Sequence, residues 1–368
     1  MRFSISLFLL FISLCVTAQK AELLPQENLS KWGIAPANYS GITHVEGDTY
    51  AVVDDKSQKD GFYLFNIKIN NKNGKIKSVS RSELRGPAHP ESKAAYADCE
   101  GVAYVPSAST LFITHESSGL VKEYKLNGEP TGAQLKIPEF LNRSHQSRNG
   151  GFESLTYNAK TQTFWLTTEN PLTTDKTITM PDGKERQPLR LVSFNRNLVA
   201  SGQWAYLMDA PELKTNVKYY THGVPALTAL PDGRVLVMER ELSIPSSYFD
   251  SKCTIKIYCV TPWANQPVGV NANAANPSAP GVVTQGTDLH LLPADKFLPK
   301  QLVATFSTNI GFQGLNYANF EGFCLGPTLN DGRQTLLLIN DSQAGAGNSL
   351  YTLKDYIKVI ILPKNFFP

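Results

Sequence analysis

The chain has 368 residues, of which 42% are hydrophobic and 18% are charged, and its 35 lysines and arginines face 32 acids. This hydrophobic fraction is too high for a disordered chain, and the composition is unlike that of collagen, a coiled coil or a polytopic membrane protein. The net charge of +3 is spread along the chain, so no basic stripe is present to bind nucleic acid or anionic lipid. We therefore expect a folded protein with no nucleic-acid partner and no membrane span.

The first residues have the pattern of an export signal. A positively charged start precedes an apolar run from Ile5 to Val16, and the small residue Ala18 follows it. About twelve apolar residues are too few for a bilayer span but suit a cleaved signal peptide. We expect residues 1–18 to be removed and the mature protein, residues 19–368, to be secreted or periplasmic.

Removal of the signal peptide would leave an even number of cysteines in an oxidising compartment, namely Cys99, Cys253, Cys259 and Cys324. Their spacing is not that of a zinc site. Two interpretations stay open, which are buried thiols and one or two disulfides.

Five segments repeat one pattern: a short apolar strand, a turn, and a second apolar strand that ends in acidic residues. They occupy residues 40–55, 100–116, 153–169, 226–239 and 321–341. The turns include Pro231-Asp232-Gly233 and Asn330-Asp331-Gly332, whose residue types suit tight hairpins. The chain is therefore built from internal repeats.

Two more strand candidates follow each of the first four pairs, such as residues 62–69 and 75–79 after the first pair. This arrangement predicts an all-β fold, a single β-propeller of four-stranded antiparallel blades, with five blades legible and six possible. Residues 262–285 are interpreted as a surface insertion. A strand from one terminus, either residues 358–362 or the stretch before Trp32, is expected to close the ring.

In such blades the start of the first strand and the end of the second lie on one face of the disc, beside the central channel. This topology predicts that ten carboxylates meet at one mouth of the channel, those of Asp54, Asp55, Glu100, Glu116, Glu153, Glu169, Glu239, Glu241, Glu321 and Asp341. Unpaired buried carboxylates repel one another, which favours a bound cation or raised pKa values. Calcium takes six to eight oxygen ligands and is the expected ion. The alternative is that backbone amides, arginines or lysines satisfy these acids.

Basic residues occupy the loops on the same face: Arg81, Arg85, His89, Lys93, Arg143, His145 and Arg148, with Arg240 at the end of a second strand. Acidic residues on this face could bind a metal ion, and the basic residues beside them could bind an anion. This combination suits an anionic substrate that is bridged by calcium, for example a phosphate. The sequence lacks G-x-S-x-G, H-E-x-x-H, Walker and G-x-G-x-x-G motifs, which argues against serine hydrolases, zincins and nucleotide-binding proteins.

At Glu100-Gly101-Val102-Ala103, Glu153-Ser154-Leu155-Thr156 and Asn319-Phe320-Glu321-Gly322-Phe323, the sequence resembles the bacterial phytase-like family with esterase-like activity. The resemblance spans roughly residues 39–353. It implies a secreted or periplasmic β-propeller that hydrolyses phosphate esters or other esters. In this sequence, Ser40 and Ala226 stand where the other units have glutamate.

On this basis we expect a monomer that hydrolyses a small-molecule ester or anionic substrate with the help of calcium. The expected calcium ligands are Glu100, Glu153, Glu321, Asp341, Asp55 and Glu116. The expected catalytic residues are Glu153, Glu169 as general base, and Arg148 and Arg240 as phosphate-orienting groups. Two alternatives stay open: a non-catalytic binding propeller with structural calcium, and a lactonase-type hydrolase.

Overall fold

The computed structural model describes residues 20–57, 59–88, 98–262, 288–312, 314–347 and 351–367. The expected signal peptide, His89, Lys93 and all but the first residue of the expected insertion lie outside the described residues. Within the described part of the chain, no helix is long and apolar enough to cross a membrane.

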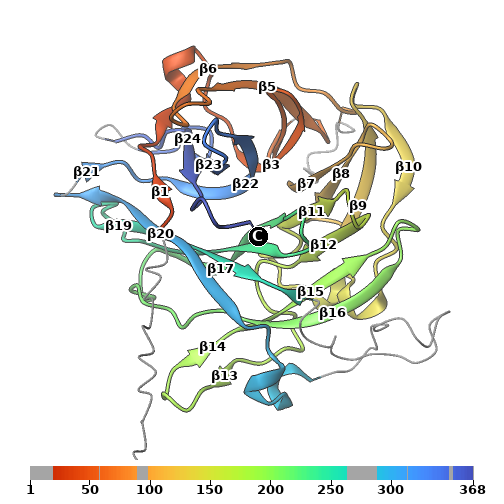
Figure 1. Cartoon of the computed structure of the whole chain (residues 1–368). Coiled ribbons are helices and arrows are strands. Elements are labelled where there is room, and N and C mark those ends of the chain that lie inside the picture. Colours follow the sequence, from red (N-terminus) through yellow and green to blue (C-terminus); the bar gives the residue numbers. More distant parts are fainter. Residues whose placement is uncertain are drawn as a thin grey trace, which may run out of the picture.

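Five antiparallel sheets surround a central axis (Figure 1), so the chain is a five-bladed β-propeller and the expected all-β architecture is confirmed. The first three blades have four strands each. Blade 1 contains β3 (Tyr39–Glu46), β4 (Thr49–Asp54), β5 (Phe62–Ile69) and β6 (Ile76–Arg81). Blade 2 contains β7 (Cys99–Val105), β8 (Thr110–His115), β9 (Leu120–Lys125) and β10 (Pro130–Gln134). Blade 3 contains β11 (Ser154–Asn158), β12 (Thr163–Thr167), β15 (Pro188–Phe194) and β16 (Ala200–Leu207).

The last two blades carry additional strands. Blade 4 contains β17 (Tyr219–Ala229), β18 (Val235–Ile244), β19 (Ser251–Val260), β20 (Lys300–Gly311) and β21 (Gly314–Leu315). Blade 5 contains β22 (Asn319–Thr328), β23 (Gln334–Asp341) and β24 (Tyr356–Ile361), and the N-terminal strands β1 (Glu22–Leu23) and β2 (Glu27–Asn28) complete it. A small hairpin of β13 (Ile178–Thr179) and β14 (Glu185–Arg186) precedes β15.

Five short 3-10 helices lie in the connections of the described chain: η1 (Leu29–Trp32), η2 (Glu139–Leu141), η3 (Arg143–His145), η5 (Leu289–Leu291) and η6 (Ala294–Lys296).

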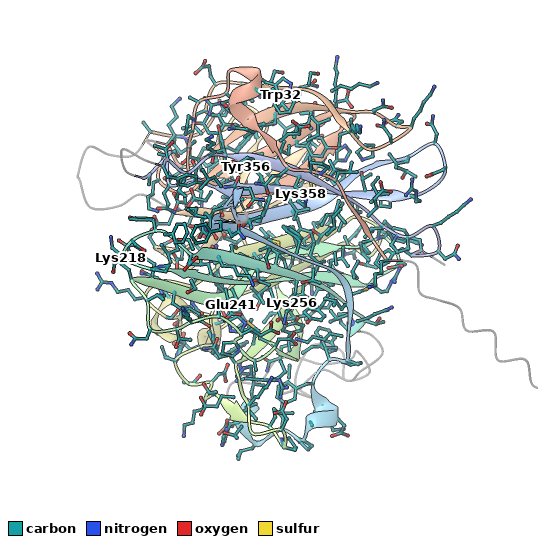
Figure 2. The ribbon with its side chains drawn as sticks, turned by 90° about the vertical axis from the view of Figure 1, so that its left-hand side faces the viewer. Trp32, Lys218, Glu241, Lys256, Tyr356 and Lys358 are labelled. Atoms are coloured by element: carbon teal, nitrogen blue, oxygen red, sulfur yellow. The ribbon has the colours of Figure 1, made fainter. Side chains whose placement is uncertain are left out.

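The ring is closed by pairing between the two ends of the chain. β1 pairs with β24 at Glu22 and Ile361, and β2 pairs with the same strand at Glu27 and Ile357. Both segments named from the sequence therefore lie in the closing blade, and Figure 2 shows Trp32, Tyr356 and Lys358 in the same part of the disc. This pairing covers one edge of β24, which would otherwise carry unpaired backbone groups.

Two inner hairpins turn at the Asp-Gly pairs that the sequence analysis named. In the turn between β17 and β18, Gly233 has a φ of +93°, a conformation that an L side chain rarely adopts. The side chain of Asp232 accepts a hydrogen bond from the backbone amide of Arg234 at 3.1 Å. The same arrangement recurs in the turn between β22 and β23, where Asp331 accepts from the amide of Arg333 at 3.0 Å. The repeated Asp-Gly turns therefore fix the inner hairpins of two blades.

The inner strands β3, β7, β11, β17 and β22 neighbour one another in that order and enclose the channel. Glycines allow them to approach closely, because a β-carbon at Gly41 would lie 2.3 Å from the carbonyl oxygen of Glu100. A β-carbon at Gly322 would lie 2.2 Å from the carbonyl oxygen of Ser40. Only glycine fits at these two positions.

The core lies between adjacent blades, where apolar faces of neighbouring sheets pack together. One such cluster includes Trp165 and Trp204 of blade 3 and Val235 and Val237 of blade 4. The four cysteines of the described chain are buried free thiols. Of the two interpretations left open by the sequence, the structure therefore supports buried thiols and not disulfides.

Candidate functional site

Three glutamates meet at one end of the channel, which we call the upper mouth: Glu100 on β7, Glu116 after β8 and Glu153 before β11. Each offers one carboxylate oxygen, and these oxygens all lie within 4.8 Å of one another. The first strand of a blade begins at this end and the second strand returns to it, which is why residues far apart in sequence converge. We call this group the glutamate triad.

Two members of the triad are buried, Glu116 is half-buried, and the negative charges of the three carboxylates repel one another. Glu100 and Glu153 are 5% and 9% exposed. Burial raises the pKa of Glu100 well above its usual range, and the charges of Asp55 and Glu321 raise it further. The pKa of Glu153 is also raised by burial, with Glu100 as the next cause. Within the described chain, neither carboxylate has an arginine or lysine nitrogen within 4.0 Å.

Backbone amides hold the third member of the triad. The amides of Gly150 and Gly151 donate to the same carboxylate oxygen of Glu116 at 2.7 and 2.8 Å. Gly150 has a φ of +103°, which turns its amide toward that oxygen. Burial raises the pKa of Glu116, whereas these two hydrogen bonds lower it. This contribution was not predicted from the sequence, although the pair of glycines just before Glu153 was a visible signal.

Arg240 crosses the upper mouth from β18 and neutralises two other acids. Its guanidinium is ion-paired with both Glu169 and Glu321, and the three side chains are at most 12% exposed. It also donates to Asn319 at 2.9 Å. The pKa of Glu321 is raised by burial to about 7, with the arginine opposing the shift. Glu169 and Glu321 are thus bound to a cationic side chain of the protein itself.

Asp55 and Asp341 lie on the remaining side of the upper mouth. Lys56 pairs with one oxygen of Asp55 at 2.8 Å, while the other oxygen is buried and has no hydrogen-bond partner within the described residues. Burial raises the pKa of Asp55 to about 6. Asp341 accepts a hydrogen bond from the amide of Gln343 at 2.6 Å, and burial also raises its pKa.

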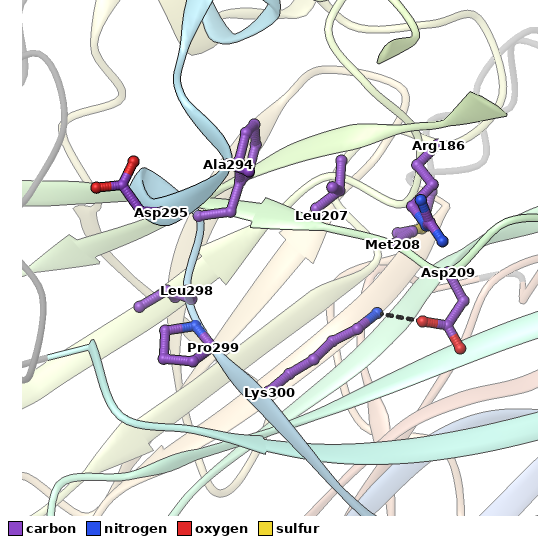
Figure 3. A pocket seen from close by; sticks show the side chains of 10 residues that line it. Arg186, Leu207, Met208, Asp209, Ala294, Asp295, Leu298, Pro299 and Lys300 are labelled. Atoms are coloured by element: carbon purple, nitrogen blue, oxygen red, sulfur yellow. Dashed lines mark ion pairs between the residues drawn. The ribbon is translucent and has the colours of Figure 1, made fainter. Parts of the chain in front are cut away.

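The remaining three of the ten carboxylates belong to other groups, so the prediction of a single ten-membered cluster is wrong. Glu239 accepts from Tyr206 at 2.6 Å and pairs with Lys300 at 2.6 Å, and the same lysine pairs with Asp209 at 2.8 Å (Figure 3). This network lies between blades 3 and 4, beside a cavity of about 460 Å³.

Glu241 and Asp54 are also directed elsewhere. Glu241 accepts from the amides of Glu212 and Leu213 at 3.0 and 2.8 Å, and it lies opposite Thr254 of the adjacent strand β19. Asp54 lies near Tyr63 and Arg81, and burial raises its pKa to about 6. For Glu239 and Glu241 the reason is the alternation of side chains along a strand: Arg240 faces the channel, so its two neighbours on β18 face blade 3.

Most of the basic residues expected on this rim are committed to local contacts. Arg81 donates to the Tyr39 hydroxyl and stacks 4.3 Å from the Tyr63 ring. Arg85 donates to the carbonyl of Leu126 at 2.7 Å, and Arg143 donates to the carbonyls of Ser147 and Arg148 at 2.7 Å each. The side chain of Arg148 is exposed, in the loop that also carries Gly150 and Gly151. His145 is half-buried in the same loop.

The geometry of the triad suits one divalent cation. Calcium binds oxygens at 2.3–2.6 Å, so two of its ligands are at most about 5 Å apart, and the triad oxygens meet that limit. The accessible space in the channel beside Glu153 and Glu321 is about 10 Å³, enough for one ion or one water molecule. Carboxylate oxygens are the ligands that calcium prefers, so the residues present fit this ion.

One family model matches most of the chain. The family model described as "Phytase-like: Esterase-like activity of phytase" matches residues 36–343. No curated protein matches the sequence. An endo-arabinase structure from Bacteroides thetaiotaomicron has 10% identity over 91% of this chain and 96% of its own, with a TM-score of 0.40. A virginiamycin B lyase from Staphylococcus aureus has 12% identity over 94% of this chain and 100% of its own, with a TM-score of 0.34. Structural similarities this weak carry no information on activity, but the family model covers most of the sequence, and the chain therefore belongs to the phytase-like family.

Proposed function

We propose that this protein is an ester hydrolase that depends on a divalent cation, with calcium as the expected ion and the upper mouth as the active site. The observation that carries the proposal is the glutamate triad, whose oxygens lie within 4.8 Å of one another. Two of its members, Glu100 and Glu153, are buried without a cationic partner in the described chain. Buried carboxylates of this kind are costly unless a cation or protons neutralise them.

Rigid elements support the triad. Glu100 lies on an inner strand that packs against its neighbour through Gly41, and two backbone amides orient Glu116. Arg240 neutralises Glu169 and Glu321, which limits the negative charge next to the triad. A cation bound here would polarise an ester oxygen and lower the pKa of a coordinated water molecule.

Asp55 is better suited to act as general base than Glu169. One oxygen of Asp55 is free of hydrogen bonds within the described residues, and its pKa of about 6 is near neutrality. Glu169, the base expected from the sequence, is ion-paired with Arg240. The negative charge of Asp55 also raises the pKa of Glu100, which is consistent with a position for Asp55 beside the triad.

The charges around the upper mouth favour a substrate with little negative charge. Arg81, Arg85 and Arg143 are committed to aromatic or backbone contacts, and Lys56 and Arg240 are paired with acids. Among the arginines and lysines that the structure describes on this rim, Arg148 is the exposed cation that keeps its guanidinium available to an anion. We therefore propose carboxylic esters, including lactones, ahead of phosphate esters.

A substrate panel tests the proposal. Hydrolysis of p-nitrophenyl butyrate, p-nitrophenyl phosphate and a γ-lactone would be measured with calcium and with chelator. We expect calcium-dependent turnover of the carboxylic ester or the lactone, and its loss in Glu153→Gln. Glu139→Gln is the matched control, because Glu139 is exposed and is not one of the glutamates that form the triad.

The panel also distinguishes the hydrolase from a non-catalytic binding propeller. Tight calcium binding without turnover of any ester would reject the hydrolase and support structural calcium. Turnover that is unchanged by chelator, or unchanged in Glu153→Gln, would reject the triad as the site. Preferential turnover of the phosphate ester would contradict the proposed substrate class.

A further inference from the structure

The opposite end of the channel, which we call the lower mouth, opens into a cavity of about 360 Å³. All five inner strands contribute to its lining near their C-terminal ends, for example His44 on β3, Tyr104 on β7 and Leu325 on β22. This volume falls within the range of small-molecule pockets. None of the residues assigned to the upper mouth lines it.

The walls of the lower mouth are mostly apolar and are preformed. Tyr104, Tyr157 and Leu325 are half-buried there, and the Tyr157 ring packs on Phe164 at 4.6 Å between centroids. Hydrogen bonds fix the polar side chains of the wall. Thr156 accepts from the amide of Ala229 at 2.9 Å, and Asn158 donates to the carbonyl of Leu230 at 2.7 Å. The cavity is therefore a built part of the fold, with two aromatic rings that can contact a flat ligand.

Its charge is opposite to that of the upper mouth. No aspartate or glutamate is among the described residues that line the cavity, whereas Lys160 lies at its edge. Lys160 is exposed, and no acid of the described chain lies within 4.0 Å of its ammonium group. Its backbone is fixed by a hydrogen bond from its amide to Asn158 at 2.9 Å. A ligand anion at this edge would meet a cation that is not already neutralised.

The two mouths do not communicate. The channel between them has only about 10 Å³ of accessible space. Inner strands touch through glycines, and a β-carbon at Gly101 would lie 2.7 Å from the amide nitrogen of Leu155. A molecule in the lower mouth therefore cannot reach the glutamate triad through the channel.

We infer that the lower mouth is a second binding site, which takes a small organic monoanion with a flat apolar body, such as an aromatic carboxylate. The apolar part would lie between Tyr104 and Tyr157, and the carboxylate would lie at the Lys160 ammonium. Burial of the apolar body supplies most of the affinity, and the exposed charge pair adds a smaller amount. This inference does not depend on the proposed hydrolase activity.

Isothermal titration calorimetry with 2-naphthoate in the presence of chelator tests the inference. We expect 2-naphthoate to bind about fivefold more tightly than 2-naphthamide, a neutral analogue of the same shape, because of the single exposed charge pair. Lys160→Gln should remove the preference for 2-naphthoate without weakening the binding of 2-naphthamide. Lys77→Gln, at an exposed lysine on the outer strand β6, is the matched control.

Two further variants test whether the ligand binds in the lower mouth: one fills the cavity and the other changes the upper mouth. Ala159→Trp places a large ring at the exposed edge of the cavity and should weaken both naphthalene ligands by about tenfold, with its folding checked by circular dichroism. Glu153→Gln should leave their affinity unchanged. Absence of naphthoate binding, full binding in both Lys160→Gln and Ala159→Trp, or loss of binding in Glu153→Gln would overturn the inference.

Discussion

The charge on Glu153 should destabilise the protein when no cation is bound. At an effective dielectric constant of about 20, two full charges 4.8 Å apart repel by about 3.5 kcal/mol. Partial protonation reduces this cost, because burial raises the pKa of both Glu100 and Glu153. Replacing Glu153 by glutamine removes one charge and keeps the shape. We therefore predict that Glu153→Gln increases the free energy of unfolding by about 1–3 kcal/mol at pH 8 in chelator.

The stability of the wild type should fall as pH rises, because the pKa values of the triad are raised in the folded state. A carboxyl whose pKa is higher in the folded state than in the unfolded state binds more protons when folded, so stability falls as pH rises. For the triad the loss of stability begins near the unfolded value of about 4.3 and continues as pH rises through the raised pKa values of Glu100, Glu116 and Glu153. The gain from Glu153→Gln should therefore be largest at pH 8 and close to zero at pH 4.5.

Calcium should reverse the order of stability. A ligand that binds only the folded state adds about 2.7 kcal/mol at one hundred times its dissociation constant. The wild type should gain this amount, and the variant, which lacks one ligand oxygen, should gain much less. Urea unfolding at pH 4.5, 6.5 and 8, with calcium and with chelator, measures all these quantities.

One result would refute the reasoning. If Glu153→Gln were destabilised equally at every pH, and equally with calcium and with chelator, the carboxylate would be serving as a fixed hydrogen-bond acceptor and no repulsion would exist to relieve. Glu139→Gln, on the surface, should change stability by less than about 0.5 kcal/mol under every condition.

The packing of the upper mouth and the core supports three more predictions. Arg240→Met leaves two buried carboxylates without their partner and should cost about 3–5 kcal/mol at pH 8 but less at pH 4.5, as measured by urea unfolding; an equal loss at both pH values would contradict the ion-pair explanation. Gly41→Ala should lower the melting temperature strongly, because its β-carbon would lie 2.3 Å from a carbonyl oxygen. Gly311→Ala is the control and should have little effect, because its β-carbon would make only a 3.5 Å contact. Equal melting temperatures of the two variants would disprove the close packing of the inner strands. The four buried thiols should react with Ellman's reagent in denaturant without reductant but not in the folded protein. If the cysteines formed disulfides instead, they would not react in denaturant until a reductant was added.

The sequence determined most of the blade strands and the turns of two inner hairpins, but not the β13–β14 hairpin or β21. The apolar segments expected at residues 62–69 and 75–79 are β5 (Phe62–Ile69) and β6 (Ile76–Arg81), and the Asp-Gly turns lie between the first two strands of blades 4 and 5. These features depend on local patterns, namely residue alternation and turn chemistry, which a sequence displays directly. The same patterns left the choice between five and six blades open.

Only the tertiary structure decided which acids share the upper mouth and which of them are already neutralised. The topology of the blades was enough to bring Glu100, Glu116 and Glu153 to one end of the channel. It could not reveal that Arg240 occupies the space between Glu169 and Glu321, because these three side chains come from three different blades. Ion pairing is set by distances across blade interfaces, and such distances exist only once the ring has closed.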